Sequence, residues 1–289
     1  MAGFFGFFDY TKPGPGVQKD ETPKPRIVLF FDILFRKFWN LLKLNMMFFL
    51  FNIPAVLTML FLMLTFVGNM FTDDVTSDLI LKFILGSIFI CIPILTVGPA
   101  QAGFTYILRN YSREEHAFLW WDFKDNAKRN FKESLIISII DLLIFVVVLF
   151  DIRAYFLFSK GSFLMSLASG FLILAFVIYM MMHMYIYPML VTFKLSVKQI
   201  YRNALLFAMM KFLPNLGILL ICAAVLVATF WNPIIGFILF PFITLSLIGF
   251  ITNFYVYPQL KKHMMDKVEI QPSTNVEKVF EENHKKADK

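Results

Sequence analysis

Two ionisable side chains, Asp141 and His183, lie inside long apolar stretches of this sequence. Charge is costly to bury in hydrocarbon, so such residues are candidates for binding a polar solute or relaying protons. Counted along helices, both lie about 12 Å from the same end of their stretches, where adjacent antiparallel helices can bring them together. Asn52 lies slightly deeper, and Gln101 and Asn253 lie nearer that end. The sharper hypothesis is a polar cavity lined by these five residues. The alternative is a structural hydrogen bond between Asp141 and His183, worth about 1 kcal/mol.

Six apolar stretches must position these side chains. Hydrophobic residues make up 58% of the 289 residues and charged residues only 16%. About 20 apolar residues match the thickness of a bilayer core, and a backbone inside lipid satisfies its own hydrogen bonds as a helix. The fold class predicted is all-α, a polytopic membrane protein with six transmembrane helices. The predicted spans are 44–71, 79–103, 134–150, 163–191, 212–230 and 233–257.

The positions of Lys and Arg predict the orientation of these spans. Of 27 such residues, 24 precede the first span, lie between the second and third or the fourth and fifth, or follow the sixth; the exceptions are Lys82, Arg153 and Lys160. Cytoplasmic loops retain Lys and Arg, so both termini are expected on the cytoplasmic side of the membrane. The net charge of +7 is spread over segments that adjoin spans. This distribution favours anionic lipid headgroups over nucleic acid as the partner.

Amphipathic segments are expected on the cytoplasmic side of the bilayer. The N-terminal region 1–43 combines an aromatic and Pro/Gly-rich start with an interfacial helix over 27–43. Ser112–Glu115 spells a capping box, which predicts the start of a second helix carrying Trp120, Trp121 and Phe123. These three aromatic residues are candidate anchors for a partner.

Ser196–Gln199 spells another capping box, which predicts a helix over 197–211. The transmembrane bundle is expected to occupy 44–258. The remaining region, 259–289, is polar and charged, which predicts a largely disordered cytoplasmic tail.

Proline and glycine mark two further features. The run Pro93–Gly103 holds two prolines and two glycines, which predicts a kink or a broken helix. Tyr185-Ile-Tyr-Pro188 resembles Tyr255-Val-Tyr-Pro258, and both sequences close an incoming span, where proline is expected to stop the helix. The similarity reflects either an internal repeat of hairpins or two uses of one stop signal.

Enzymatic motifs and metal-ligand spacings are missing from the sequence. Cys91 and Cys222 both lie in predicted spans, so neither a disulfide framework nor a metal site is indicated. There is no P-loop, no G-x-S-x-G and no H-E-x-x-H. We therefore expect a non-enzymatic protein without cofactor or metal. The oligomeric state is not indicated.

Two segments carry a resemblance to a known family, Pro93–Gly103 and Trp121–Ser134. The first contains Pro-x-x-Thr-x-Gly-x-Ala, and the second contains Asp-Phe followed by Asn-Phe-Lys. With these motifs the chain resembles the YesL-like family of bacterial membrane proteins, and Asp9–Val17 is similar to the start of longer members. The resemblance implies a six-helix bundle in the inner membrane. Genes of this family often lie beside those for carbohydrate-uptake ABC transporters and glycoside hydrolases, which implies an accessory role in sugar uptake.

The sequence therefore supports two alternative functions. In the first, the protein is an accessory or scaffold component of a carbohydrate uptake system, and its cytoplasmic elements dock an ABC permease or ATPase subunit. In the second, the bundle is a small transporter whose pathway is lined by Asn52, Asp141 and His183, with Thr96–Gly103 as its hinge or binding element.

Overall fold

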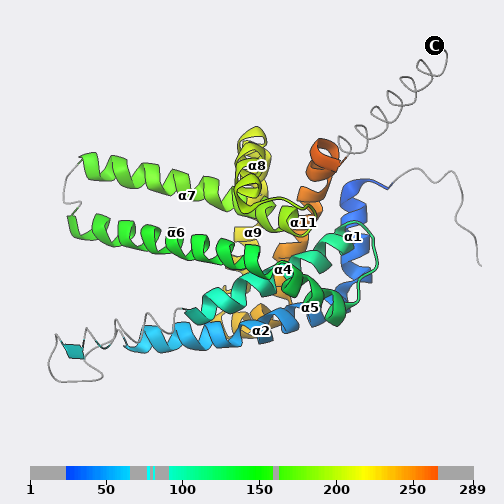
Figure 1. The fold of residues 1–289 in the computed structure, drawn as a ribbon, viewed down its shortest axis with the longest axis horizontal. Helices are drawn as coiled ribbons and strands as arrows, with labels where there is room; N and C mark the ends of the chain where they lie inside the picture. The colour runs from blue at the N-terminus through cyan, green and yellow to red at the C-terminus, as the bar shows by residue number, and fades with distance from the viewer. Residues whose placement is uncertain (1–23, 66–76, 79–80, 82–90, 159–162, 266–289) are drawn as a thin grey trace, which may run out of the picture. The chain divides into compact units, whose positions relative to one another are not determined.

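A computed structural model describes residues 24–65, 77–78, 81, 91–158 and 163–265, and this part of the chain consists of helices joined by short turns and loops, without strands (Figure 1). The predicted N-terminal aromatic segment and most of the tail lie outside the described residues. The helices are α1 (Arg26–Arg36), α2 (Phe38–Thr65), α4 (Cys91–Ser112), α5 (Leu119–Arg129), α6 (Phe131–Phe158), α7 (Phe163–Leu190), α8 (Val197–Met210), α9 (Phe212–Thr229), α10 (Pro233–Leu239) and α11 (Leu245–Leu260), with π-helical segments η1 (Phe240–Thr244) and η2 (Lys261–Met265).

Contacts divide the chain into two units, Met1–Arg36 and Lys37–Lys289. The first unit contains α1, and Lys24, just before this helix, forms an exposed ion pair with Asp32 on it at 2.6 Å. The second unit contains the other helices and every site discussed below.

Four helical segments in the described part of the chain are long and apolar enough to cross a membrane. They cover Phe38–Thr58, Ser166–Leu190, Phe212–Thr229 and Pro233–Met265. The chain is therefore a multi-pass helical membrane protein. Of the two other predicted spans, 79–103 is described only at residue 81 and over 91–103, which belong to α4, and 134–150 lies within α6; both stay predictions.

The order of elements repeats three times along the chain. An amphipathic helix is followed, after a single residue, by a long apolar helix that begins with phenylalanine: Phe38 after α1, Phe131 after α5 and Phe212 after α8. The connection from α4 to α5 covers residues 113–118 and that from α7 to α8 covers 191–196, so both are six residues long. The recurrence of an amphipathic helix followed by a long apolar helix favours an internal repeat of hairpins over two independent uses of one stop signal.

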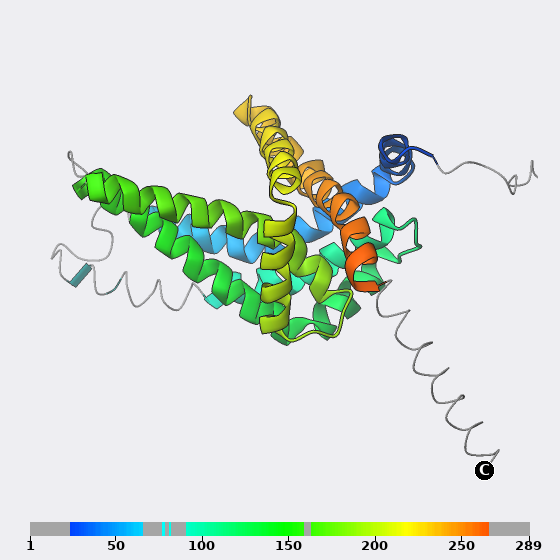
Figure 2. The ribbon, with the colours of Figure 1, turned by 90° about the horizontal axis from the view of Figure 1, so that it is seen from above.

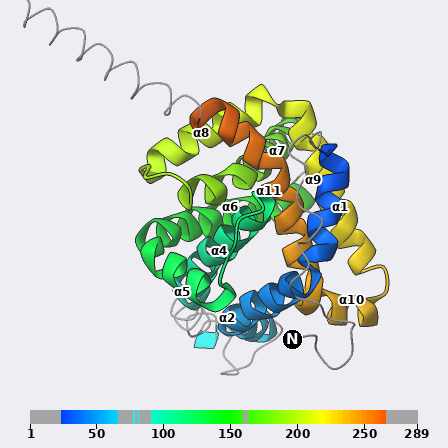
Figure 3. The same cartoon turned by 90° about the vertical axis from the view of Figure 1, so that its right-hand side faces the viewer.

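Helix α4 lies at the centre of the second unit and contacts α2, α5, α6, α7 and α11 (Figure 3). Glycines allow this close packing. A Cβ on Gly98 would lie 2.4 Å from the carbonyl oxygen of Ser134 on α6, and one on Gly103 would lie 2.5 Å from that of Phe123 on α5. Small residues at helix contacts are typical of membrane bundles, because they let backbones approach.

Of the two alternatives predicted over Pro93–Gly103, the broken helix is wrong, and the kink stays a prediction. Helix α4 runs continuously from Cys91 to Ser112 and contains Pro99. Proline removes one backbone donor, but the neighbouring helices hold the segment in place. The glycines here serve helix packing.

Two other local predictions also need correction. Ser112 does not cap α5: its hydroxyl donates to the carbonyl of Arg109 at 2.7 Å, α4 ends there, and the chain turns through Glu114 at φ 61°. Helix α5 starts after Phe118 without a side-chain cap. Proline does not stop α7 or α11 either, since each helix continues two residues past it, to Leu190 and Leu260. The capping box at Ser196 is confirmed, with Ser196 and Gln199 bonded reciprocally.

Helices α6 and α7 form one antiparallel pair, and α9 and α11, joined through α10, form another (Figure 2). Helix α8 packs on α7. The buried core where these elements meet includes Met181, Tyr185, Ile200, Phe207 and Val256.

Candidate functional site

Asp141 on α6 and His183 on α7 lie in contact, 3.2 Å apart between the carboxylate Oδ2 and the imidazole Nε2. Asp141 is ten residues from the start of α6 and His183 is seven from the end of α7. At 1.5 Å per residue they lie about 15 Å and about 10 Å from these helix ends. The antiparallel pairing of α6 and α7 thus brings together two residues 42 positions apart.

Tyr179, one helical turn before His183, donates its hydroxyl to the other carboxylate oxygen of Asp141. The side chains of Asp141 and His183 are 29% and 33% exposed. Two hydrogen-bond partners stabilise this carboxylate within a largely apolar pair of helices. Chemically, the three groups can share and move a proton.

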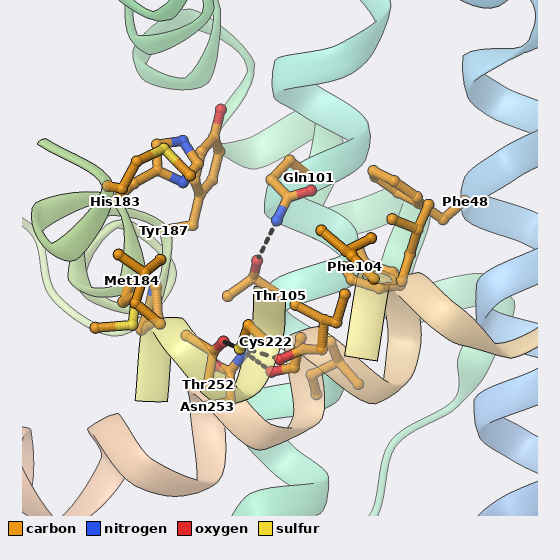
Figure 4. A pocket seen from close by; sticks show the side chains of 18 of the residues that line it. Phe48, Gln101, Phe104, Thr105, His183, Met184, Tyr187, Cys222, Thr252 and Asn253 are labelled. Carbon is orange, nitrogen blue, oxygen red and sulfur yellow. Dashed lines mark hydrogen bonds between the residues drawn. The ribbon is translucent and has the colours of Figure 1, made fainter. Parts of the chain in front are cut away.

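A pocket of about 330 Å³ lies beside this pair, between α4, α7, α9 and α11, with Phe48 of α2 in its wall. It brings together three of the five predicted residues: Gln101, His183 and Asn253. Figure 4 shows Gln101 and His183 on different walls, and Asn253 beside Thr252 and Cys222. The Gln101 amide donates to the Thr105 hydroxyl at 3.5 Å.

Asn52 and Asp141 do not line this pocket. Asn52 donates its amide to the carbonyl of Phe48 in its own helix, at 2.8 Å. Asp141 contacts His183 but is not itself in the pocket wall. The predicted five-residue cavity is therefore, in the structure, a three-residue pocket with Asp141 behind it and Asn52 elsewhere.

Asn215 on α9 is a polar centre that the sequence did not indicate. Its side-chain oxygen accepts hydrogen bonds from the hydroxyls of Tyr185 at 2.7 Å and Tyr255 at 2.8 Å. Its amide donates to the carbonyls of Phe207 and Ala208. These two tyrosines are the first of each Tyr-x-Tyr-Pro sequence, so the repeated sequence was the available signal. Asn215 joins α7, α8, α9 and α11 and is fully buried.

Asn45 on α2 forms a second such centre, at the π-helical segment η1. Its amide donates to the carbonyl of Phe240 at 2.9 Å, and its oxygen accepts from the N–H of Ser246 at 2.6 Å. Irregular backbone inside a membrane requires such partners. The side chain thus links α2 to the sixth predicted span.

The three aromatic residues on α5 differ in exposure. Trp120 and Trp121 are 50% and 63% exposed, whereas Phe123 is 1% exposed. Phe123 packs on Gly103 and on the ring of Phe51, with ring centroids 5.2 Å apart. Phe123 is therefore the residue that fixes α5, and only the two tryptophans are available to a partner.

Cationic and aromatic side chains meet at the end of α4. Arg109 donates to the carbonyl of Val191 at 2.7 Å, just past the end of α7, and lies over the ring of Tyr106. Burial lowers the pKa of Arg109 from its usual value, and the nearby Arg113 lowers it further. Burial also raises the pKa of Tyr111 to about 12. Lys37 lies over the Tyr111 ring.

Among the described residues, no group of three or more His, Cys, Asp or Glu side chains could hold a metal ion.

Residues 41–152 match a family described as "Protein of unknown function, DUF624", the family to which YesL-like proteins belong. The match covers α4, α5 and most of α2 and α6 and confirms the resemblance over this segment. No curated protein and no solved structure matches the chain.

Proposed function

We propose that this protein is a non-enzymatic accessory or scaffold component of a bacterial carbohydrate uptake system. In this proposal six spans hold it in the plasma membrane, with both termini and the amphipathic helices α1, α5 and α8 on the cytoplasmic side. The distribution of Lys and Arg supports this orientation, since 24 of 27 fall on one side of the predicted spans. Anionic lipid headgroups would be its lipid partners on that side.

The observation that carries the proposal is the exposed tryptophan pair on a fixed helix. Helix α5 is fixed to α4 because Phe123 packs against Gly103 without an intervening side chain. Trp120 and Trp121 then project from a rigid support, and Lys124 lies 6.0 Å from the Trp121 ring. Aromatic residues held on a rigid element are the usual anchors of protein interfaces. The partner proposed is the permease or ATPase subunit of an ABC sugar transporter.

Co-purification tests this docking role. The double variant Trp120→Ala/Trp121→Ala is expected to lose the permease–ATPase complex at least tenfold, because losing one anchor worth about 2 kcal/mol already exceeds tenfold. The matched control is Trp39→Ala/Trp231→Ala, since these two tryptophans are 73% and 86% exposed. Equal recovery of the complex with both double variants would remove the docking role.

A small transporter is the second candidate, favoured by the Asp141–His183 contact beside the pocket. Ionisable residues that pair with one another inside membrane-spanning segments are typical of transport pathways. Uptake of a radiolabelled sugar by the purified protein alone in liposomes, abolished by Asp141→Asn at unchanged membrane level, would favour it. Absence of uptake, together with lower membrane level of Asp141→Asn, would favour a structural role for the pair.

A further inference from the structure

One wall of the pocket between α4, α7, α9 and α11 contains a buried hydrogen-bond acceptor without a partner among the described residues. Asn253 is 5% exposed and lines the pocket. Its amide nitrogen donates to the carbonyl of Gly249 at 2.8 Å, while its Oδ1 accepts no hydrogen bond from any described residue. A buried acceptor left unpaired is unfavourable, so native proteins almost always pair it with protein, water or ligand.

The rest of the pocket restricts what that ligand can be. Its walls are mostly apolar, including Phe104, Met184, Leu219 and Ile248, and no Asp, Glu, Lys or Arg is among the residues that line it. His183 is also in the wall, but its Nε2 pairs with Asp141 behind the pocket. A charged ligand would therefore lose its hydration without gaining a free counter-charge. The volume of about 330 Å³ lies at the small end of the range for ligand pockets.

The polar groups in the walls are already largely engaged. The Thr252 hydroxyl donates to the carbonyl of Ile248 at 2.8 Å, and Thr105 accepts from Gln101. A sugar, with a hydroxyl on almost every carbon, would leave most of its groups unpaired here. A ligand with one hydroxyl and an apolar body fits the walls.

We propose that this pocket binds an uncharged amphiphile, an alcohol with an apolar chain whose hydroxyl donates a hydrogen bond to Oδ1 of Asn253. The site is independent of the docking role on α5, and neither requires the other. The same chemistry can come from a lipid of the bilayer or from a free small alcohol.

Asn52 provides a closely matched control. It is 8% exposed, its amide donates to the carbonyl four residues earlier at 2.8 Å, and its Oδ1 also has no partner among the described residues. It differs from Asn253 in lying outside the pocket. Asn253→Leu and Asn52→Leu therefore remove the same kind of acceptor. The first substitution changes the pocket wall, whereas the second leaves the pocket intact.

Photolabelling of the full-length protein in lipid nanodiscs tests the proposal. The probe is a diazirine-bearing C10 alcohol, compared with the diazirine-bearing C10 carboxylic acid at pH 7.5. The alcohol is expected to label pocket residues of α4, α9 and α11, at least fivefold more than the acid. Asn253→Leu is expected to reduce labelling by the alcohol at least fivefold, whereas Asn52→Leu leaves it unchanged. Equal labelling of the wild type and Asn253→Leu, or equal labelling by the acid, would overturn the proposal.

Cys222 offers a second measurement that needs no change at Asn253. Cys222 lines the same pocket and is 8% exposed. In a Cys91→Ser background, decan-1-ol is expected to slow alkylation of Cys222 by N-ethylmaleimide severalfold, whereas decane is not. An equal effect of alcohol and alkane would contradict a hydroxyl-specific site. If hexadecan-1-ol reduces photolabelling but hexan-1-ol does not, the natural ligand is a lipid of the bilayer. If hexan-1-ol reduces it and hexadecan-1-ol does not, the natural ligand is a free small alcohol.

Discussion

The substitution Asn215→Leu tests whether the amide centre between α7, α8, α9 and α11 holds these helices together. It removes the acceptor of Tyr185 and Tyr255 and the donor to two backbone carbonyls. Hydrogen bonds within membrane proteins contribute about 0.6 kcal/mol each on average, so loss of four costs about 2.4 kcal/mol. Leaving two phenol hydroxyls unpaired raises the cost, at about 1–3 kcal/mol for each. We expect a total of about 4–8 kcal/mol.

The triple variant Asn215→Leu/Tyr185→Phe/Tyr255→Phe separates lost hydrogen bonds from unpaired hydroxyls. Replacing both partners of a buried hydrogen bond by apolar groups is close to neutral, so the triple variant should recover about 2–6 kcal/mol relative to Asn215→Leu alone. Tyr185→Phe by itself should cost only about 1 kcal/mol, because the Asn215 oxygen still accepts from Tyr255.

The assay is reversible unfolding of the purified protein in mixed micelles, followed by circular dichroism and compared at equal detergent composition. A triple variant that is no more stable than Asn215→Leu would refute the reasoning. So would an Asn215→Leu protein as stable as the wild type.

Three further substitutions follow from the packing. Gly103→Ala should destabilise the protein by about 1–3 kcal/mol and weaken partner docking, because its Cβ would meet the Phe123 carbonyl at 2.5 Å; unchanged unfolding and docking would contradict this. Asn45→Leu should speed amide hydrogen exchange of Ser246 at least tenfold relative to the end of α9, since that N–H loses its partner; mass spectrometry of residues 240–250 measures it. Tyr111→Phe should reduce the loss of stability between pH 10 and 12. Because the pKa of Tyr111 is raised to about 12, its contribution is complete below about pH 10 and is lost as the pH rises through 12. Parallel curves for wild type and variant in alkaline unfolding would contradict this assignment.

The Asp141–His183 contact could be anticipated because charge is rare in apolar segments. Once two long helices are predicted to be antiparallel neighbours, helical rise places both side chains at similar depth. The capping box at Ser196 could also be predicted from the sequence, since it is a local motif whose two side chains lie three residues apart. In contrast, the capping-box pattern at Ser112 was misleading, because Ser112 is the last residue of α4. The pattern alone does not show whether such a serine begins one helix or ends the previous one.

The polar centres at Asn45 and Asn215 could not be predicted from local sequence. Asn45 contacts backbone groups 195 and 201 residues away, at a π-helical segment that no local pattern indicated. Phe123 was also misjudged as an exposed anchor, because its burial depends on Gly103 lying opposite. Contacts of this kind are set by how helices cross, and a single sequence shows only which faces are available.

Labelling of single cysteines in intact cells tests the central claim most directly, because the docking role requires α5 and α8 to face the cytoplasm. In a Cys91→Ser/Cys222→Ser background, Asn232→Cys lies in the turn before α10 and Lys198→Cys lies in the first turn of α8. A membrane-impermeant maleimide is expected to label Asn232→Cys in intact cells and Lys198→Cys only after the membrane is opened. Labelling of Lys198→Cys in intact cells, with protection of Asn232→Cys, would contradict the account.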